Sequence, residues 1–189
     1  MGFLDTLLGR TKPVPPKLDD LFEVPTAAIT LQASMGLVPT GTGSVCFRAA
    51  EGRAFSDIEK DVRQLLSMGS EAGQVEVTND SYGFTWLVCR HAADDVGALV
   101  TDLHAVNTSL VDAGFGSALL CTLVAFTNGT RSLGLVYLYK RGTWYPFVPV
   151  GGDRRDNATE LQIRSVIGTD LRFEEDLARW FPVYGAPGL

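Results

Sequence analysis

The passage from Leu119 to Val150 is the longest apolar, aromatic and β-branched stretch of the sequence, and it constrains the fold more than any other. Asn128-Gly129 and Arg141-Gly142 interrupt it, so the pattern predicts three antiparallel strands joined by turns. Asn-Gly favours a tight hairpin, in which both central residues have positive φ angles. Pro146 and Pro149 remove backbone donors from the third run and therefore place it at an edge of the sheet.

Three helices are predicted from start and stop signals around apolar stripes. The capping box Ser56 to Glu59 opens a stripe that ends at Gly69. Asp94 or Asp95 caps the most regular helix in the chain, which ends at Gly114. A second capping box, Asn157 to Glu160, opens a helix that ends at Gly168. Its inward-facing residues are expected to be Leu161, Val166 and Ile167.

A short helix or turn is predicted at Leu18 to Glu23, and Glu174 to Asp176 open a last short helix that carries Leu177, Trp180 and Phe181. The remaining segments are predicted mainly as strands and turns. Residues 74–78 and 83–90 alternate in polarity and form a hairpin turned at 79–82. Pro39 to Gly43 is a glycine-rich turn before a strand at Ser44 to Ala49. Residues 26–35 fit a helix or a strand, and their Ile and Thr content favours a strand or mixed structure.

The order of these elements does not alternate strand with helix one to one. This favours an α+β fold, with a largely antiparallel sheet and helices packed on it, over a doubly wound parallel sheet. The order also resembles the α/β sandwich of small secretion chaperones. We expect one such domain over residues 18–189.

Two short segments precede that domain. Residues 1–10 form an amphipathic segment with Phe3, Leu4, Leu7 and Leu8 on one helical face. So short a segment is barely helical alone in water and needs a surface. Its own domain, a partner and a lipid interface all stay open as that surface. Residues 11–17 are proline-rich and are predicted to be an extended spacer.

Charge and cysteine content limit the class of protein. The net charge of −6 argues against general nucleic-acid binding. Cys46, Cys89 and Cys121 each lie in an apolar, strand-like run, which predicts buried thiols in a reducing cytosol. No apolar run approaches the ~20 residues of a membrane-spanning helix, and the N-terminal residues lack a secretory-signal pattern. We therefore expect a cytoplasmic protein.

No grouping of residues predicts catalysis, a cofactor or a metal site. Cys89 and His91 supply half a zinc site at most, because no second pair stands nearby. His104 flanks the apolar stripe of a predicted helix. The glycine-rich run Gly41 to Ser44 lacks the Gly-Lys-[Ser/Thr] ending of a phosphate loop. A pocket in the sheet formed by His104, Cys89 and this run would instead define a small-molecule-binding protein or an enzyme.

Basic and aromatic residues gather late in the chain. Lys140 and Arg141 lie at a predicted hairpin end, Trp144 follows them, and Arg154 and Arg155 precede a helix. If these ends converge, they form a partner or anion patch suited to a carboxylate-rich helix or an anionic lipid. Ordinary turn and loop charge is the alternative interpretation.

Several long passages resemble one family along almost the whole chain. They are "MGFLDTLLGRTKP", "ITLQASMGLVPTGTGSVCFRAA", "LVTDLHAVNTSL", "LVYLYKRGTWYPF", "RRDNATELQIR" and "RWFPVYGAPGL". Together they resemble the PspA-associated protein PspAB family of high-GC Gram-positive bacteria. The resemblance implies a cytoplasmic bacterial accessory protein linked to PspA. PspA belongs to the phage-shock system, a membrane-stress response built on ESCRT-III-like coiled-coil proteins. The family carries no catalytic motif that maps onto this sequence.

These observations lead us to expect a non-enzymatic adaptor. Its expected partner is a PspA-like coiled-coil protein, and an anionic membrane surface is a further contact, at the inner face of the plasma membrane. Nucleic acid is not expected as a partner, and a homo-oligomer stays open. The two alternatives are the small-molecule binder or enzyme described above and a chaperone-like domain that holds a partner.

Overall fold

The computed structural model describes residues 17–48 and 75–189, which form one six-stranded antiparallel sheet with helices packed on it. The strand order is β2-β3-β1-β4-β5-β6. The strands are β1 (Val38–Arg48), β2 (Glu76–Asn79), β3 (Phe84–Arg90), β4 (Leu119–Thr127), β5 (Ser132–Leu138) and β6 (Thr143–Phe147). The helices are η1 (Leu18–Glu23), α2 (Val24–Met35), α4 (Val96–Asp112), α5 (Asn157–Ile167) and η2 (Leu177–Arg179). The predicted α+β fold is confirmed, as are the 74–90 hairpin, the 119–150 meander and its edge strand.

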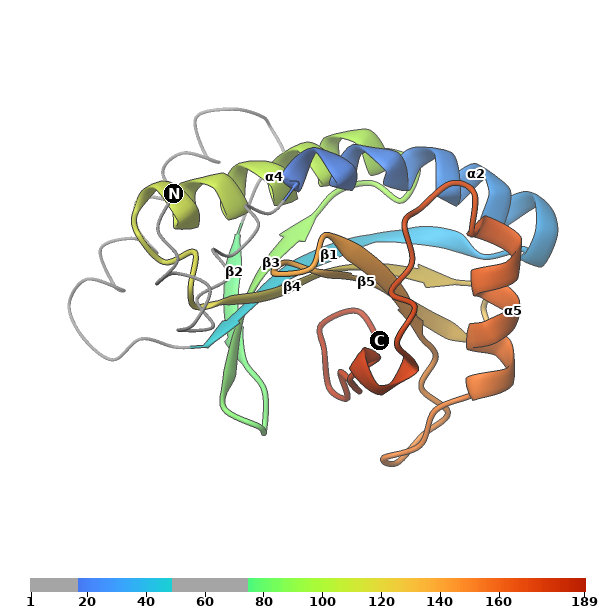
Figure 1. Cartoon of the computed structure of the whole chain (residues 1–189). Coiled ribbons are helices and arrows are strands. Elements are labelled where there is room, and N and C mark those ends of the chain that lie inside the picture. The colour runs from blue at the N-terminus through green and yellow to red at the C-terminus, as the bar shows by residue number, and fades with distance from the viewer. Residues whose placement is uncertain (1–16, 49–74) are drawn as a thin grey trace, which may run out of the picture.

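The two faces of the sheet are covered differently (Figure 1). Helices α2 and α4 lie side by side over one face, and α5 packs against β6 and α2. The chain after α5 returns to the opposite face, where η2 and the C-terminal residues lie. Strand alternation supplies a core to each side: Val45 and Leu87 face the helices, while Cys46 and Trp86 face the C-terminal segment. The sheet is therefore apolar on both faces.

Helix α2 replaces the strand or mixed structure expected for residues 26–35. Val24, Ala27, Ala28 and Leu31 are buried at the three- and four-residue spacing of a helix. Gly36 ends the helix with a φ of 65°. The Ile and Thr residues of this segment favour a strand only weakly. Burial of the apolar face of α2 against the sheet outweighs that preference.

The glycine-rich run at 39–43 is part of β1, so the predicted turn there was wrong. The pairing of β1 with β4 shifts register between Pro39 and Gly43, which marks a bulge rather than a reversal of the chain. The His91 N–H donates to the Gly41 carbonyl at 2.9 Å, where Gly41 has a φ of 78°. The bulge thus keeps the strand continuous.

The turn after β4 contains four residues rather than two. Asn128 keeps a negative φ and uses its side chain instead, since its Oδ1 accepts from the N–H groups of Thr130 and Arg131. Only Gly129 has the positive φ expected for the pair, at 85°. The hairpin forms where predicted, although by different turn chemistry.

Helix α5 is capped by the residue that precedes its predicted capping box. The cap is Asp156, whose Oδ1 accepts from the Thr159 N–H at 3.0 Å. Of the residues expected to face inward, Ile167 is buried, whereas Leu161 is 47% exposed. The segments 1–10 and 11–16 and the capping box at Ser56 lie outside the described residues.

Candidate functional site

An apolar groove of about 970 Å³ opens between the sheet and the C-terminal segment. Its lining is predominantly apolar, and it lies on the face opposite α2 and α4. The sheet residues that line it are Cys46, Phe84, Trp86, Leu120, Cys121, Leu138 and Tyr145. The C-terminal segment supplies the facing wall, from Phe181 to Tyr184. The volume lies at the upper end of the range of small-molecule sites, roughly 300–1,000 Å³.

The groove exists because the C-terminal segment covers only part of this face. The ring of Trp180 stacks on that of Tyr145 with centroids 6.2 Å apart, and the Tyr145 hydroxyl donates to the Phe181 carbonyl at 2.8 Å. Tyr184 meets Phe147 edge to face at 5.1 Å. These contacts fasten the segment over β6, while Leu120 and Leu138 stay only partly buried. Apolar surface is thus left open to a ligand.

Four cationic side chains line the groove, and two of them have no partner among the residues that the structure describes. Arg141 pairs with Glu174 at 2.9 Å, and Arg179 pairs with Asp176 at 3.0 Å. Arg48 and Lys140 are exposed, and within residues 17–48 and 75–189 their side chains make no ion pair or hydrogen bond. We call Arg48 and Lys140 the cationic rim. Its charge is available to an anion.

The two carboxylates in the lining are already engaged. Asp80 accepts from the Trp86 Nε1 at 2.9 Å and from two backbone N–H groups of the β2–β3 turn. Asp153 accepts from the Tyr82 hydroxyl at 3.4 Å. These donors are uncharged, so they orient the two carboxylates without neutralising them, and the residues that line the groove comprise four cations and two carboxylates.

Cys46 and Cys121 lie opposite each other in the pairing of β1 with β4, on the floor of the groove. A hydrogen bond with Cys121 and burial raise the pKa of the Cys46 thiol far above its ordinary value. On the helix-covered face, burial raises the pKa of Cys89 to about 12. All three thiols are buried, as predicted, and Cys46 and Cys89 stay protonated near neutral pH.

The structure separates the residues of the predicted partner or anion patch. Lys140 and Arg141 lie at the groove. Trp144 is fully buried on the helix-covered face and offers no surface to a partner. Arg154 lies on an exposed turn, and Arg155 binds Glu160 inside the protein with its Nε 2.9 Å from both carboxylate oxygens. The predicted contact residues Phe3, Leu4, Leu7 and Leu8 lie outside the described residues.

The residues proposed for an alternative pocket do not line this groove. His104 lies 3.3 Å from Asp19 and packs on Phe22, and the run Gly41 to Ser44 is part of β1 outside the groove lining. His91, which was considered with Cys89 as half a zinc site, pairs with Asp102 at 2.7 Å. Cys89 belongs to the helix-covered core. In the part of the chain that the structure describes, no group of three or more His, Cys, Asp or Glu side chains is placed to hold a metal ion.

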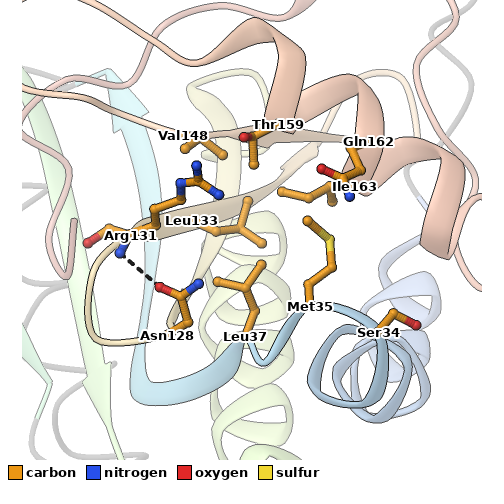
Figure 2. A pocket seen from close by; sticks show the side chains of 11 residues that line it. Ser34, Met35, Leu37, Asn128, Arg131, Leu133, Val148, Thr159, Gln162 and Ile163 are labelled. Atoms are coloured by element: carbon orange, nitrogen blue, oxygen red, sulfur yellow. Dashed lines mark hydrogen bonds between the residues drawn. The ribbon is translucent and has the colours of Figure 1, made fainter.

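A second, smaller pocket of about 190 Å³ lies where the end of α2 meets the β4–β5 turn and α5 (Figure 2). Met35, Leu37 and Leu133 lie around it, with Arg131 at one side. The Arg131 N–H donates to the Asn128 Oδ1, a contact that shapes the turn. Its volume falls below the usual range for ligand sites, so the large groove is the stronger candidate.

Sequence reasoning missed the groove because the residues that form it look like ordinary core. Cys46, Cys121 and Leu138 belong to runs that are apolar on both faces, which predicts two covered faces. Arg48 and Lys140 could have indicated the groove, because each places a charge at the end of one of these apolar runs. Whether the face opposite α2 and α4 is fully covered depends on the path of residues 169–189. No local sequence pattern predicts that path.

The fold and the groove define an α+β protein with a cation-rimmed apolar site and, among the described residues, no metal-binding cluster. The chain belongs to the PspA associated protein B family, PspAB, whose sequence pattern matches residues 1–188. The name of the family denotes association with PspA. No curated protein and no solved structure matches the chain. None of the helices within the described ranges is long and apolar enough to cross a membrane.

Proposed function

We propose that this protein is a non-enzymatic adaptor of the PspA-linked membrane-stress response, acting in the bacterial cytoplasm and at the inner face of the plasma membrane. The observation that carries the proposal is the family match over essentially the whole chain. The proposed partner is a PspA-like coiled-coil protein.

The cationic rim is the proposed contact surface for the coiled coil. Arg48 and Lys140 carry charges that no described residue pairs with, on a protein whose net charge is −6. Phe181, 58% exposed, and Tyr82, 56% exposed, line the same groove. Aromatic residues beside cations suit a carboxylate-rich helix, because the charges guide association and the rings supply contact area.

The N-terminal segment 1–10 is the proposed second contact, with an anionic membrane surface or with the same partner. Lys17 fixes the point where the spacer joins the domain, because its carbonyl accepts from the Tyr137 hydroxyl at 2.7 Å. Gly142 lies beside that hydroxyl, in the turn that follows Lys140. The segment is therefore attached at the end of the sheet that carries part of the rim.

Co-purification of the tagged full chain with the PspA protein of the same cell tests the adaptor role. We expect capture by the wild type and loss of capture by the double variant Arg48→Glu, Lys140→Glu. The variant Arg154→Glu is the matched control, since Arg154 is an exposed arginine outside the groove. Equal capture by both variants would remove the rim from the proposal, and no capture by the wild type would remove the adaptor role.

Sedimentation with anionic liposomes tests the membrane contact separately. The full chain is expected to sediment with vesicles of phosphatidylglycerol, and a chain lacking residues 1–10 is expected to stay in the supernatant. Equal and negligible sedimentation of both chains would contradict this contact. The sedimentation coefficient of the full chain without lipid would also show whether a homo-oligomer forms, as a chaperone-like role would require.

The groove itself favours a second candidate function, the binding of a small molecule. This was the first alternative from the sequence, and its pocket lies on the sheet, although His104 and Cys89 do not line it. A site of this volume with an apolar floor and a charged edge suits an amphiphile.

A further inference from the structure

We propose that the groove binds a single-chain aliphatic carboxylate, with its hydrocarbon chain along the floor and its head group at the cationic rim. This inference goes beyond the proposed adaptor role and does not depend on it, because it concerns a ligand of the isolated protein. It rests on the apolar floor, on the volume of the groove and on the two rim cations, which have no partner in residues 17–48 and 75–189.

The floor has the chemistry of a hydrocarbon site. Leu120, Leu138 and Phe84 are only partly buried, so a chain lying on them would remove apolar surface from water. The thiol of Cys46 is an apolar neighbour rather than a nucleophile, since burial and its hydrogen bond with Cys121 keep it protonated. The floor therefore favours aliphatic chain over polar ligand atoms.

The rim selects the charge of the head group. Arg48 and Lys140 have no partner among the described residues, whereas Asp80 and Asp153 are held by hydrogen bonds from Trp86 and Tyr82. An anionic head would find available donors there, and a cationic head would face four lining cations against two lining carboxylates. A carboxylate at the rim remains in contact with water, so it avoids the cost of burying a charge.

The facing wall encloses the groove on the side away from the sheet. The segment from Phe181 to Tyr184 is held by the Tyr145 hydrogen bond and the Phe147 ring contact. A volume of about 970 Å³ accommodates one extended chain with its head group, within the range of small-molecule sites. The proposal commits to one single-chain ligand per protein, and the stoichiometry of binding tests it.

Titration calorimetry with dodecanoate, below its micelle concentration and on the full chain, tests the proposal. We expect saturable binding of one dodecanoate per chain. Decanoate should bind about tenfold more weakly, since each methylene removed costs roughly threefold. Dodecyltrimethylammonium, with the same chain and the opposite charge, should bind about tenfold more weakly at low salt. Butanoate should not bind measurably.

Variants assign the two ends of the ligand. The ratio of the dodecanoate affinity to the dodecyltrimethylammonium affinity should fall in the double variant Arg48→Gln, Lys140→Gln. The expected fall is about threefold per cation, because exposed ion pairs contribute little. Arg154→Gln should leave this affinity ratio unchanged. Leu138→Asp should abolish binding of both amphiphiles, while Ile29→Asp, at a 71% exposed site on α2, should leave binding unchanged. Leu120→Trp, which fills the groove, replaces Leu138→Asp if that variant does not fold.

Thiol labelling locates the site without any substitution. Dodecanoate should slow N-ethylmaleimide labelling of Cys121, on the groove floor, and leave the rate at Cys89 unchanged, because Cys89 lies on the other face of the sheet. The proposal is overturned if no dodecanoate binds, if both head-group charges bind equally, or if Cys121 is not protected. Absence of binding would also indicate that the chain itself or a second copy fills the groove. The co-purification result would stand apart from any of these outcomes.

Discussion

At the scale of single residues, buried carboxylates fix the C-terminal part of the chain. Glu174 accepts from Arg141 at 2.9 Å and from the Thr143 hydroxyl at 2.9 Å, and so joins the β5–β6 turn to the residues before η2. Glu160 accepts from Arg155 and from the Val148 N–H at 2.9 Å. Arg155 also donates to the carbonyls of Trp180 and Pro146. These bonds place the wall of the groove.

Glu174→Gln should destabilise the protein in a pH-dependent way. Burial alone would raise the pKa of Glu174, but hydrogen bonds from Arg141, the Asp176 N–H and Thr143 outweigh it and hold this pKa below its ordinary value of 4.5. The ionised carboxylate therefore stabilises the fold above about pH 4.5, and that contribution is lost as the pH falls through the lowered folded-state pKa. Urea unfolding should show a loss of about 1–2 kcal/mol at neutral pH that shrinks on acidification. Glu175→Gln, at an exposed site, is the control. A pH-independent loss would contradict this account.

The adjacent residues Arg154 and Arg155 should respond very differently to substitution. Arg155→Gln leaves the Glu160 side chain, 2% exposed, without its cationic partner, and should cost about 3–5 kcal/mol of unfolding free energy. Arg154→Gln should change it by less than about 0.5 kcal/mol, since Arg154 is exposed. Chemical denaturation of the two variants measures both values. Similar losses of unfolding free energy in the two variants would mean that Arg155 does not hold the C-terminal segment as described.

At the scale of elements, helix caps and strand alternation explain what the sequence predicted well. Helix α4 begins after Asp95, and its buried residues keep the predicted period from Leu99 to Leu110. The meander follows from its apolar runs and turns. Helix α2 was missed because its weak amphipathic pattern, with Ile29 exposed, competes with the strand preference of Ile and Thr. Local sequence signals thus predicted a helix correctly only where the hydrophobic period and the capping residue both indicate one.

Removal of the α4 cap tests which of the two adjacent aspartates starts the helix. The Asp95 Oδ1 accepts from the Ala98 N–H at 3.0 Å, whereas Asp94 is exposed and makes no such bond. Asp95→Ala should therefore lower the unfolding free energy by about 1 kcal/mol, and Asp94→Ala should leave it nearly unchanged. Thermal unfolding of the pair decides the assignment. Equal shifts in Tm would show that capping is shared.

At the scale of the whole molecule, the C-terminal segment decides whether the second face of the sheet is core or site. Trp180 is 6% exposed, and its Nε1 donates to the Glu174 carbonyl at 2.9 Å. Its stacking on Tyr145 closes the β6 side of this face. The face over Cys46, Cys121 and Leu138 stays open as the groove. The C-terminal segment thus buries one part of this face and leaves the other part open as a binding surface.

Trp180→Ala should loosen that segment and destabilise the protein by about 3–5 kcal/mol, the usual cost of truncating a buried Trp. Phe181→Ala, at the neighbouring and 58% exposed position, should cost less than about 1 kcal/mol. Both are measured by denaturant unfolding. Hydrogen exchange should show faster exchange at the Ala186 N–H, which bonds to Val183, in the Trp180 variant alone. Equal exchange in the two variants would place the anchor elsewhere.

The sequence by itself determined the antiparallel meander, the helix after Asp95 and the burial of the three thiols, because hydrophobic period, caps and turns are local properties. The family followed from long passages of sequence. Only the tertiary structure decided that Lys140 and Arg48 meet at an open groove while Trp144 and Arg155 turn inward. That outcome depends on contacts between residues far apart in the chain, on the order of the strands and on where the C-terminal segment stops covering the sheet. Local sequence patterns do not specify such long-range contacts.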